Sequence, residues 1–340
     1  MKEIIPDIDA WLAQGQTHIA LATVIHTWGS APRKIGAKMA FTAGGALCGS
    51  VSGGCVEGAV IEAGGAVLAS GIPQLLHFGV ADETAWEVGL ACGGVIDVFV
   101  EPLDPEAYAL LREMTRQDHA GASVTVLRGS AELIGRKWIE ERNGRSLTQL
   151  PAAITDQLSV LPASTQRLQL SDDLEIFVEQ FRPAPTLIMV GGVHIAIALA
   201  SMAKTLGFRT IVIDPRRAFG SDERFPHADQ LLTLWPQKAF AQLEITPETA
   251  VALLTHDPKI DDPALEIVLP SAAFYVGALG SRKTHAKRIE RLQQKGVDAA
   301  QISRIHAPIG LNLNAQTPEE IALSVLAEVV KTYRTESNMS

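Results

Sequence analysis

The chain has 340 residues, which is enough for about two domains that each bury a full hydrophobic core. Its 29 Lys and Arg against 38 Asp and Glu give a net charge of −9, which argues against sequence-independent binding of nucleic acid or of an anionic membrane surface. Hydrophobic residues make up 47% and charged residues 20%, which is typical of a globular protein and excludes a disordered chain.

The first fifteen residues form an amphipathic pattern that predicts a helix. Glu3 and Asp7 stand where a secretory leader would be basic and then apolar, and no run of about 18 apolar residues follows anywhere. We therefore expect a cytoplasmic protein without a membrane segment. The chain has three cysteines, Cys48, Cys55 and Cys92. An odd cysteine count without a CxxC pair argues against a disulfide framework and against a structural zinc site.

Glycine is concentrated near the start of the chain, where 16 of the 28 glycines fall in the first 100 residues. Fifteen of them lie between Gly29 and Gly94, in a pattern of short strands, tight turns and one helix. Cys48 lies in a strand-like segment and is expected in the core. The predicted elements are strands at 18–29, 38–42, 73–80 and 92–103 and a helix at 55–70.

Residues 104–180 predict a helix followed by short alternating segments, which we interpret as a small antiparallel appendage to the first domain. The segment 181–186 contains Pro183 and Pro185 and breaks this pattern. We therefore expect an N-terminal domain at 1–182 and a C-terminal domain at 183–340.

From residue 186 the pattern changes to strand, helix, strand, which indicates a βαβ unit. Further strands are predicted at 230–234, 250–257 and 272–280, and a final helix begins at a capping box formed by Thr317 and Glu320. The sequence thus predicts an α/β protein with a glycine-rich α/β N-terminal domain and a C-terminal, Rossmann-like, doubly wound parallel sheet.

The turn after the first strand of this second domain begins Gly191, Gly192, Val193, His194. A dinucleotide fingerprint would have glycine at 191, 193 and 196, and only Gly191 is present. Asp214 ends the next strand, where a ribose-binding acid belongs. The helix N-terminus can hold an anion, to which His194 would donate; alternatively, His194 is only a polar cap.

Two further polar groups follow predicted strands of the second domain. His256 and Asp257 are either a base with its orienting acid or turn-forming side chains. Ser281 and the adjacent Arg282 open a basic helix, which indicates either a phosphate site or a solvated helix face.

The N-terminal domain has two glycine loops, at 29–33 and 50–55, whose backbone N–H groups can converge on an anion. Cys55 is expected to begin the following helix, where the positive helix end would stabilise a thiolate, and Cys92 is a second thiol in a glycine turn. The alternative is that both cysteines only pack in the core. The candidate ligand-binding residues of this domain are Gly29, Ser30, Arg33, Ser52, Gly53, Gly54, Cys55 and Cys92.

Seven motifs follow one another over nearly the whole chain, from GSAPRKIGAKM and SVSGGCVEGAV through VGGVHIAIAL and YVGALGSRKTHAKR to IHAPIGLNLNAQTPEEIA. Together and in this order they resemble the XdhC/CoxI family. The resemblance implies an accessory, non-enzymatic maturation factor of molybdenum hydroxylases. It implies a bound molybdenum cofactor, as molybdopterin or its cytosine dinucleotide form, with Cys55 and Cys92 as candidate neighbours of the metal. It also implies an apo-hydroxylase client, a cysteine desulfurase partner and a homodimer.

Two other functions remain open from the sequence. An NAD(P)-dependent oxidoreductase would use the βαβ unit and Asp214, although Val193 departs from the fingerprint. A scaffold would connect a desulfurase to an apo-hydroxylase without holding the cofactor.

Overall fold

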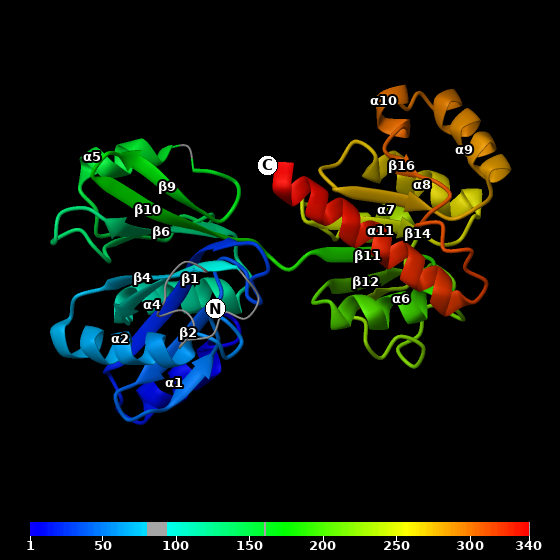
Figure 1. Ribbon diagram of the computed structural model, residues 1–340. Helices are drawn as coiled ribbons and strands as arrows, with labels where there is room; N and C mark the ends of the chain where they lie inside the picture. Colours follow the sequence, from blue (N-terminus) through cyan, green and yellow to red (C-terminus); the bar gives the residue numbers. More distant parts are fainter. Residues whose placement is uncertain (80–93, 160, 340) are drawn as a thin grey trace. The chain divides into compact units, whose positions relative to one another are not determined.

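The computed structural model describes residues 1–79, 94–159 and 161–339, with the backbone alone at 159 and 336–339 (Figure 1). The chain forms two compact units, Met1–Arg182 and Pro183–Ser340. In the N-terminal unit the elements are α1 (Ile5–Ala13), β1 (Ile19–Trp28), β2 (Lys38–Thr42), β3 (Leu47–Gly49), α2 (Glu57–Ser70), β4 (Gln74–Phe78), β5 (Val95–Pro102), α4 (Pro105–Arg116), β6 (Gly121–Arg128), β7 (Lys137–Glu141), β8 (Ser146–Thr148), α5 (Ala152–Thr155), the 3₁₀ turn η1 (Asp156–Ser159), β9 (Gln166–Ser171) and β10 (Leu174–Phe181).

The N-terminal unit is built from two five-stranded antiparallel sheets, ordered β3-β2-β1-β5-β4 and β8-β7-β6-β10-β9. Helix α2 lies across one face of the first sheet (Figure 1) and packs on β1 and β5. Gly64 of this helix sits directly against the ring of Phe41, where a Cβ atom would be 2.0 Å from Cζ. The middle section, predicted as a small appendage, is indeed antiparallel, but its sheet has as many strands as the first.

The two sheets repeat one another in topology and in register. Thr23 pairs with Lys38 and Phe99 in the first sheet, as Thr125 pairs with Lys137 and Phe177 in the second. Both central strands skip one residue of the ladder at the equivalent place, Ile25 and Leu127.

The turns after the two central strands repeat as well. Gly36 donates to the carbonyl of Val24 at 2.8 Å, and Gly135 donates to that of Val126 at 2.9 Å. The two glycines have φ values of 86° and 83°, which a left-handed turn position requires. The N-terminal unit is therefore a tandem repeat of one five-stranded design.

The two sheets face each other across a shared layer of side chains. Ile25 and Phe99 from the first sheet pack with Leu127 and Phe177 from the second. Beside them lie two reciprocal ion pairs and a small pocket of about 30 Å³. Each pair joins one sheet to the other within the compact N-terminal unit.

The C-terminal unit contains a six-stranded parallel sheet in the order β13-β12-β11-β14-β15-β16. Helices α6 and α11 cover one face, and α7, α8 and α9 cover the other (Figure 1). The structure thus confirms the predicted doubly wound, Rossmann-like class. Its elements are β11 (Thr186–Val190), α6 (His194–Thr205), β12 (Arg209–Ile213), β13 (Gln230–Leu232), α7 (Pro236–Phe240), β14 (Thr249–Leu253), α8 (Pro258–Val268), β15 (Tyr275–Ala278), α9 (Arg282–Gln294), α10 (Ala299–Ile302), β16 (Ile305–His306) and α11 (Pro318–Met339).

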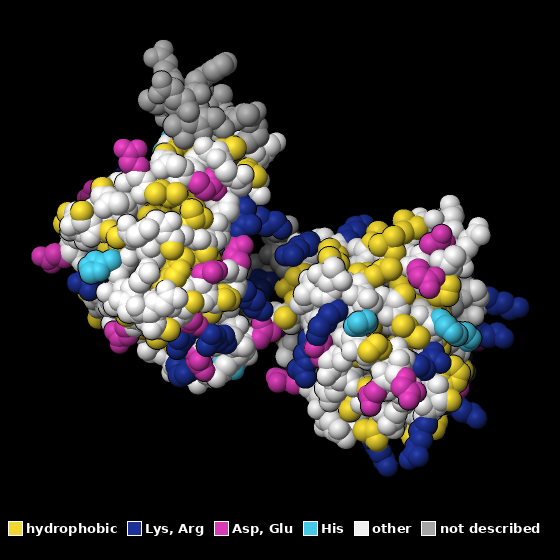
Figure 2. Space-filling view, turned by 90° about the horizontal axis from the view of Figure 1, so that it is seen from below, with side chains coloured by type: hydrophobic (Ala, Val, Ile, Leu, Met, Phe, Trp, Pro, Cys, Tyr) yellow, Lys and Arg dark blue, Asp and Glu magenta, His cyan; other side chains and the backbone are white. Residues whose placement is uncertain are grey.

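The predicted capping box at the start of α11 is confirmed. The Thr317 hydroxyl accepts from the Glu320 N–H at 3.2 Å, and the Glu320 carboxylate accepts from the Thr317 N–H at 3.1 Å. No helix among the described residues has the length and apolar character needed to cross a membrane. On the face of the C-terminal unit seen in Figure 2, basic and acidic side chains are interspersed.

Candidate functional site

Two predicted glycine loops of the N-terminal unit lie side by side. The loop at 29–33 follows β1, and the loop at 50–55 joins β3 to α2. Arg33 Nε donates to the Ser50 carbonyl at 3.1 Å, and a Cβ atom on Gly53 would lie 3.8 Å from Cβ of Pro32. The fold therefore unites loops that are about twenty residues apart in the sequence.

A third segment reaches the same place. A Cβ atom on Gly94 would lie 2.9 Å from the carbonyl oxygen of Trp28 and 3.1 Å from that of Ser30, so only glycine permits this approach. Gly29 has a φ of 71° and, like Ser30, is exposed. Cys92 precedes Gly94 by two residues and lies outside the described residues.

The second loop wraps around the carboxylate of Glu57, a residue that the sequence analysis missed. Glu57 Oε1 accepts from the Ser50 hydroxyl at 2.8 Å and from the N–H groups of Val51, Ser52 and Gly53 at 3.2, 2.9 and 3.0 Å. Oε2 accepts from the Gly54 N–H at 2.9 Å and from the Ser52 hydroxyl. Burial raises the pKa of Glu57, but hydrogen bonds from Ser52 and Ser50 outweigh it and lower that pKa to about 2.

The expectation that Cys55 begins the helix is wrong, because α2 begins at Glu57. Gly53 and Gly54 have φ values of 82° and 121°, which an α-helix cannot contain. Cys55 is half-buried and packs against the cluster that includes Val51 and Val56. The carboxylate of Glu57, not the Cys55 thiol, accepts the hydrogen bonds of the N–H groups that precede the helix.

Cys48 lies in the core, as expected from the sequence. It is buried, and its Sγ is 3.9 Å from the Ile4 carbonyl oxygen, to which it donates. Burial raises the pKa of the Cys48 thiol to about 11. Of the two described cysteines, only Cys55 is partly accessible.

The repeat of the N-terminal unit shows which features are particular to the first half. The Ser50 N–H donates to the Lys38 carbonyl at 3.1 Å, and its counterpart, the Gln149 N–H, donates to the Lys137 carbonyl at 2.9 Å. After Gln149 the second half continues with Leu150 and a proline, without the glycine pair or a cysteine. The glycine loop is thus an addition to a framework that folds without it.

In the C-terminal unit, both glycines of the turn after β11 are needed for contacts within the chain. A Cβ atom on Gly191 would lie 2.4 Å from Cγ2 of Thr255, and one on Gly192 would lie 2.2 Å from the carbonyl oxygen of Phe219. In a dinucleotide site the pyrophosphate approaches the backbone at the second fingerprint glycine, and that position is Val193 in this chain. At the neighbouring Gly192, the chain's own Phe219 carbonyl takes the space of a side chain.

Asp214 is fully buried, and both its oxygens are bonded within the chain. Oδ2 accepts from the Gly192 N–H at 2.7 Å and from Arg216 Nη2 at 2.8 Å, and Oδ1 accepts from the N–H and Nε of Arg216, both at 2.9 Å. Burial raises the pKa of Asp214, but the hydrogen bonds from Arg216 and Gly192 lower it below its ordinary value.

His194 is the first residue of α6, after Val193, which provides no side-chain cap. Its imidazole is exposed and lines an open groove of about 640 Å³. Arg224 and His227 line the same groove, and Arg224 Nη2 donates to the Gly192 carbonyl at 3.1 Å. Glu223 and Glu319 line it as well, so the turn adjoins a groove of mixed charge, and its Gly192 N–H is already bonded.

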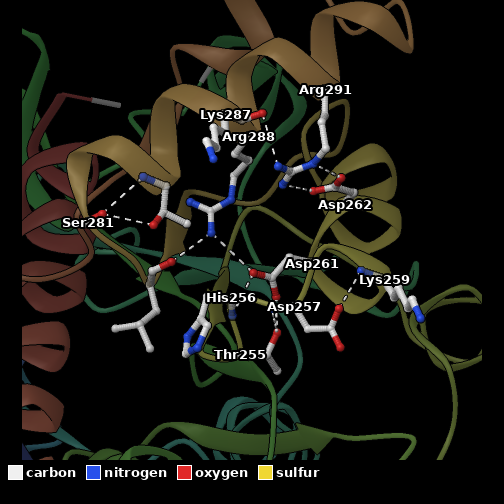
Figure 3. Close-up of polar contacts among 12 residues, drawn as sticks. Thr255, His256, Asp257, Lys259, Asp261, Asp262, Ser281, Lys287, Arg288 and Arg291 are labelled. Carbon is white, nitrogen blue, oxygen red and sulfur yellow. Dashed lines mark hydrogen bonds and ion pairs between the residues drawn. The ribbon is translucent and has the colours of Figure 1, made fainter.

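Ser281 caps α9, and its hydroxyl accepts from the Thr284 N–H at 3.2 Å (Figure 3). Arg282 follows it and is exposed, as is Lys283. This leaves a serine cap and two exposed cations together at the carboxyl edge of the sheet, after β15.

A buried network lies next to this cap (Figure 3). Arg288, which is 1% exposed, donates through Nη2 to the Leu279 carbonyl at 2.8 Å and to Asp261 at 3.3 Å. Asp261 also accepts from the Thr255 hydroxyl and, at 3.0 Å, from the His256 N–H. Nε and Nη1 of Arg288 have no hydrogen-bond partner among the described residues.

The network holds His256 with a φ of 72°, a left-handed conformation that is uncommon outside glycine. Its imidazole is exposed at the carboxyl edge of the sheet. Asp257 caps α8 by accepting from the Lys259 N–H at 2.9 Å, so it has the turn-forming role that the sequence left open. Sequence reasoning missed Asp261 and Arg288, although Arg288 stands out as a charged residue four positions before the buried Leu292.

No cluster of three or more His, Cys, Asp or Glu side chains with the geometry of a metal site occurs within residues 1–79, 94–159 and 161–339. Cys55 is accordingly a single half-buried thiol and not a member of such a cluster among the described residues.

Models of two protein families match the chain. One is described as the XdhC and CoxI family and matches residues 11–79, and the other is described as the XdhC Rossmann domain and matches residues 187–329. The first match contains both glycine loops with Cys55. The second contains the turn at Gly191 and the Arg288 network.

Curated relatives align over most of the chain. A Bacillus subtilis protein named as a probable xanthine dehydrogenase subunit is 30% identical over 95% of this chain and 96% of its own length. The Escherichia coli molybdenum cofactor insertion chaperone PaoD is 31% identical over 91% of this chain and 81% of its own. A crystal structure of a Bacillus halodurans protein described as a xanthine dehydrogenase has the same fold, with a TM-score of 0.73, 24% identity and coverage of 97% and 96%.

Proposed function

The chain belongs to the XdhC and CoxI family, and from this we propose that it is a cytoplasmic chaperone that binds the molybdenum cofactor as cargo. It holds the cofactor, supports its sulfuration and assists its insertion into a molybdenum hydroxylase. The client is an enzyme of the xanthine dehydrogenase, aldehyde oxidoreductase or CO dehydrogenase type. The named function of the PaoD relative supports the insertion role.

The observation that carries this proposal is the joined pair of glycine loops in the N-terminal unit. Arg33 bonds to the Ser50 carbonyl, and the loop that it holds presents the half-buried Cys55. A soft thiol suits molybdenum that already carries the dithiolene ligands of its cofactor. Cys55, with Cys92 on the segment that leads to Gly94, is accordingly our candidate for the metal end of the cargo.

The C-terminal unit by itself has two candidate anion sites, the turn at Gly191–His194 and the start of α9. Gly192 donates its N–H to Asp214, so the turn at Gly191–His194 offers fewer donors than its sequence indicates. The start of α9 offers the Ser281 cap with exposed Arg282, and buried Arg288 beneath it has two donors without a partner among the described residues. We propose that this helix start, rather than the turn, is the anion-binding site of the C-terminal unit.

The proposal includes two protein partners and a symmetric assembly. An apo-molybdenum hydroxylase receives the cofactor, and a cysteine desulfurase supplies the sulfur. The chaperone itself acts as a homodimer. These assignments come from the family resemblance together with the chaperone name of one relative.

Retained molybdenum tests the proposal directly. The full chain is mixed with isolated cofactor, desalted and assayed for molybdenum, as wild type and as the Cys55→Ala, Cys92→Ala and Cys48→Ala variants. We expect near-stoichiometric metal in the wild type and in Cys48→Ala, and at least a tenfold loss in Cys55→Ala. Equal retention by all variants removes the cysteines from the site. Failure of the wild type together with capture of both partner proteins indicates the scaffold function.

The alternative function is an NAD(P)-dependent oxidoreductase. Its support is the βαβ unit with Asp214 at the end of β12. Against it stand Val193 and the Asp214 carboxylate, which is turned away from solvent and bonded to Arg216. A fluorescence titration with NADH and NADPH separates the two functions, since micromolar binding with turnover of an aldehyde or ketone supports the oxidoreductase.

A further inference from the structure

The loop from Ser50 to Glu57 is an anion-binding loop whose anion belongs to the chain. Four backbone N–H groups and two hydroxyls converge on the two carboxylate oxygens of Glu57. Convergent N–H groups of this kind are how glycine loops bind phosphate. Here each donor already has an ionised acceptor, so a phosphate gains these bonds only by displacing Glu57.

The same hydrogen bonds fix the backbone on both sides of Cys55. The Gly54 N–H, before it, donates to Glu57 Oε2 at 2.9 Å. The Val56 N–H, after it, donates to the Ser52 hydroxyl oxygen at 3.0 Å, and that hydroxyl in turn donates to Glu57. Because Gly53 and Gly54 have little conformational preference of their own, this carboxylate is what selects one conformation for the loop.

The second half of the tandem repeat shows that the framework does not require this device. At the equivalent point, Gln149 keeps the backbone bond to β7 but is followed by Leu150 and Pro151. That segment turns into α5 without a glycine pair, and Asp156, which has the spacing of Glu57, lies in the 3₁₀ turn after α5 instead of at the start of a helix. The Glu57 carboxylate therefore serves the loop that carries Cys55.

We propose that Glu57 is the built-in anion of this loop, that it is a positioning residue for Cys55, and that the loop does not bind the phosphate of a ligand. The proposal rests on the proposed function only in taking Cys55 as the residue that meets the cargo. Ser52, Gly53 and Gly54, which the sequence predicted as ligand-binding residues, then have the role of holding the Cys55 thiol in place.

Thiol alkylation tests the positioning role without any molybdenum. The full chain is treated with iodoacetamide, and the rate at each cysteine is read by mass spectrometry for the wild type and Glu57→Gln. Glu62→Gln is the matched control, because Glu62 is an exposed residue of the same helix. We expect at least a fivefold faster reaction of Cys55 in Glu57→Gln and no change in Glu62→Gln.

Cys48 reports on the folding of the unit in the same experiment, since it is buried next to Ile4. We expect its rate to stay at the wild-type value in Glu57→Gln. An unchanged Cys55 rate overturns the proposal. A rise at Cys48 equal to that at Cys55 also overturns it, because Glu57 would then support the whole unit rather than the loop.

Rescue and anion titration separate a built-in anion from a packing residue. In Glu57→Ala, added acetate should restore the slow alkylation of Cys55, and Glu57→Asp should lie between wild type and Glu57→Gln. Millimolar inorganic phosphate should leave the amide resonances of Gly53 and Gly54 unchanged in the wild type. Shifts of these resonances in the wild type overturn the proposal. Loss of molybdenum retention in the wild type, with these results intact, overturns the proposed function alone.

Discussion

Lys38 on β2 and Glu179 on β10 form a buried ion pair at 2.9 Å that joins the two sheets of the N-terminal unit. The Lys38 Nζ also donates to the Thr23 hydroxyl at 3.3 Å. Lys137 repeats the arrangement with Glu101 at 2.7 Å and with Thr125 at 3.0 Å. The tandem repeat therefore extends to the charges buried between its halves.

Replacing Lys38 by Met should destabilise the N-terminal unit by about 3–5 kcal/mol, because it leaves Glu179 charged and largely buried. Hydrogen exchange of the β1 and β10 amides measures this loss. The double variant Lys38→Met, Glu179→Leu should recover most of it. Lys2→Met, at a pair whose Lys side chain is 67% exposed, should change stability by less than about 1 kcal/mol. Similar losses at Lys2 and Lys38 would contradict the prediction.

Glu57 should make the N-terminal unit depend on acid pH. Its pKa is lowered to about 2 in the folded chain, so its contribution is complete above the ordinary carboxyl pKa and is lost as the pH falls towards 2. Glu57→Gln should therefore be less stable than wild type by about 1–2 kcal/mol at pH 7, after allowance for solvent screening. Denaturant unfolding from pH 7 to pH 2.5 checks whether this difference shrinks with falling pH; a constant difference would refute the assignment.

Gly64 and Gly65 of α2 should respond in opposite directions to alanine. A Cβ atom on Gly64 would lie 2.0 Å from the ring of Phe41, so Gly64→Ala should destabilise the unit by about 1–3 kcal/mol. Gly65 has nothing within 4 Å of that position, so Gly65→Ala should stabilise the unit by about 0.5–1 kcal/mol. Thermal unfolding of the two variants decides this, and two shifts of the same sign would show that α2 packs differently.

Arg288→Met should destabilise the C-terminal unit by about 3–5 kcal/mol, because Asp261 would be left without its buried cation. Burial already raises the pKa of Asp261 above its ordinary value, and removal of Arg288, whose charge lowers that pKa, raises it further. The loss should consequently be smaller at pH 5 than at pH 7. Hydrogen exchange in β14 and β15 at both pH values is the measurement, with the exposed Lys287→Met as control; equal losses at the two pH values would contradict it.

Restoring a fingerprint glycine should not create a dinucleotide site. In Val193→Gly the Gly192 N–H still donates to Asp214, and the Phe219 carbonyl still lies where a Cβ atom of Gly192 would be. We expect a dissociation constant for NADH no tighter than about 1 mM, which corresponds to a binding free energy of about −4 kcal/mol at most in magnitude. NADH fluorescence gives the answer, and low-micromolar binding by this variant would show that the turn opens to ligand.

Local patterns in the sequence were sufficient for most elements and for the class of the C-terminal unit. Alternating and continuous apolar segments placed β1, β11 and β14, and the capping box placed the start of α11. Cys48 was correctly expected in the core. Such patterns can be recognised in a sequence because the buried residues of a strand or a helix recur with the period of that element.

Contacts between distant segments were decided only by the tertiary structure. The two halves of the tandem repeat share only short segments, Gly-Ser-Ala at 29–31 and 129–131 and Ile-Gly-x-Lys at 35–38 and 134–137. The repeat became visible through hydrogen-bond register, with Thr23 and Thr125 in equivalent places. Asp261 and Arg288 are 27 residues apart and meet only because α8 and α9 pack together. Long-range pairing leaves no periodic trace in either segment.

The glycines show the same division. Their number between Gly29 and Gly94 indicated loops that need backbone freedom, and the positive φ angles of Gly53 and Gly54 agree with that. What the freedom serves was decided in three dimensions, where the loop closes on the carboxylate of Glu57 and Gly192 makes room for Phe219. A glycine in the sequence indicates a position where a side chain does not fit, and only the folded chain shows which group occupies that space.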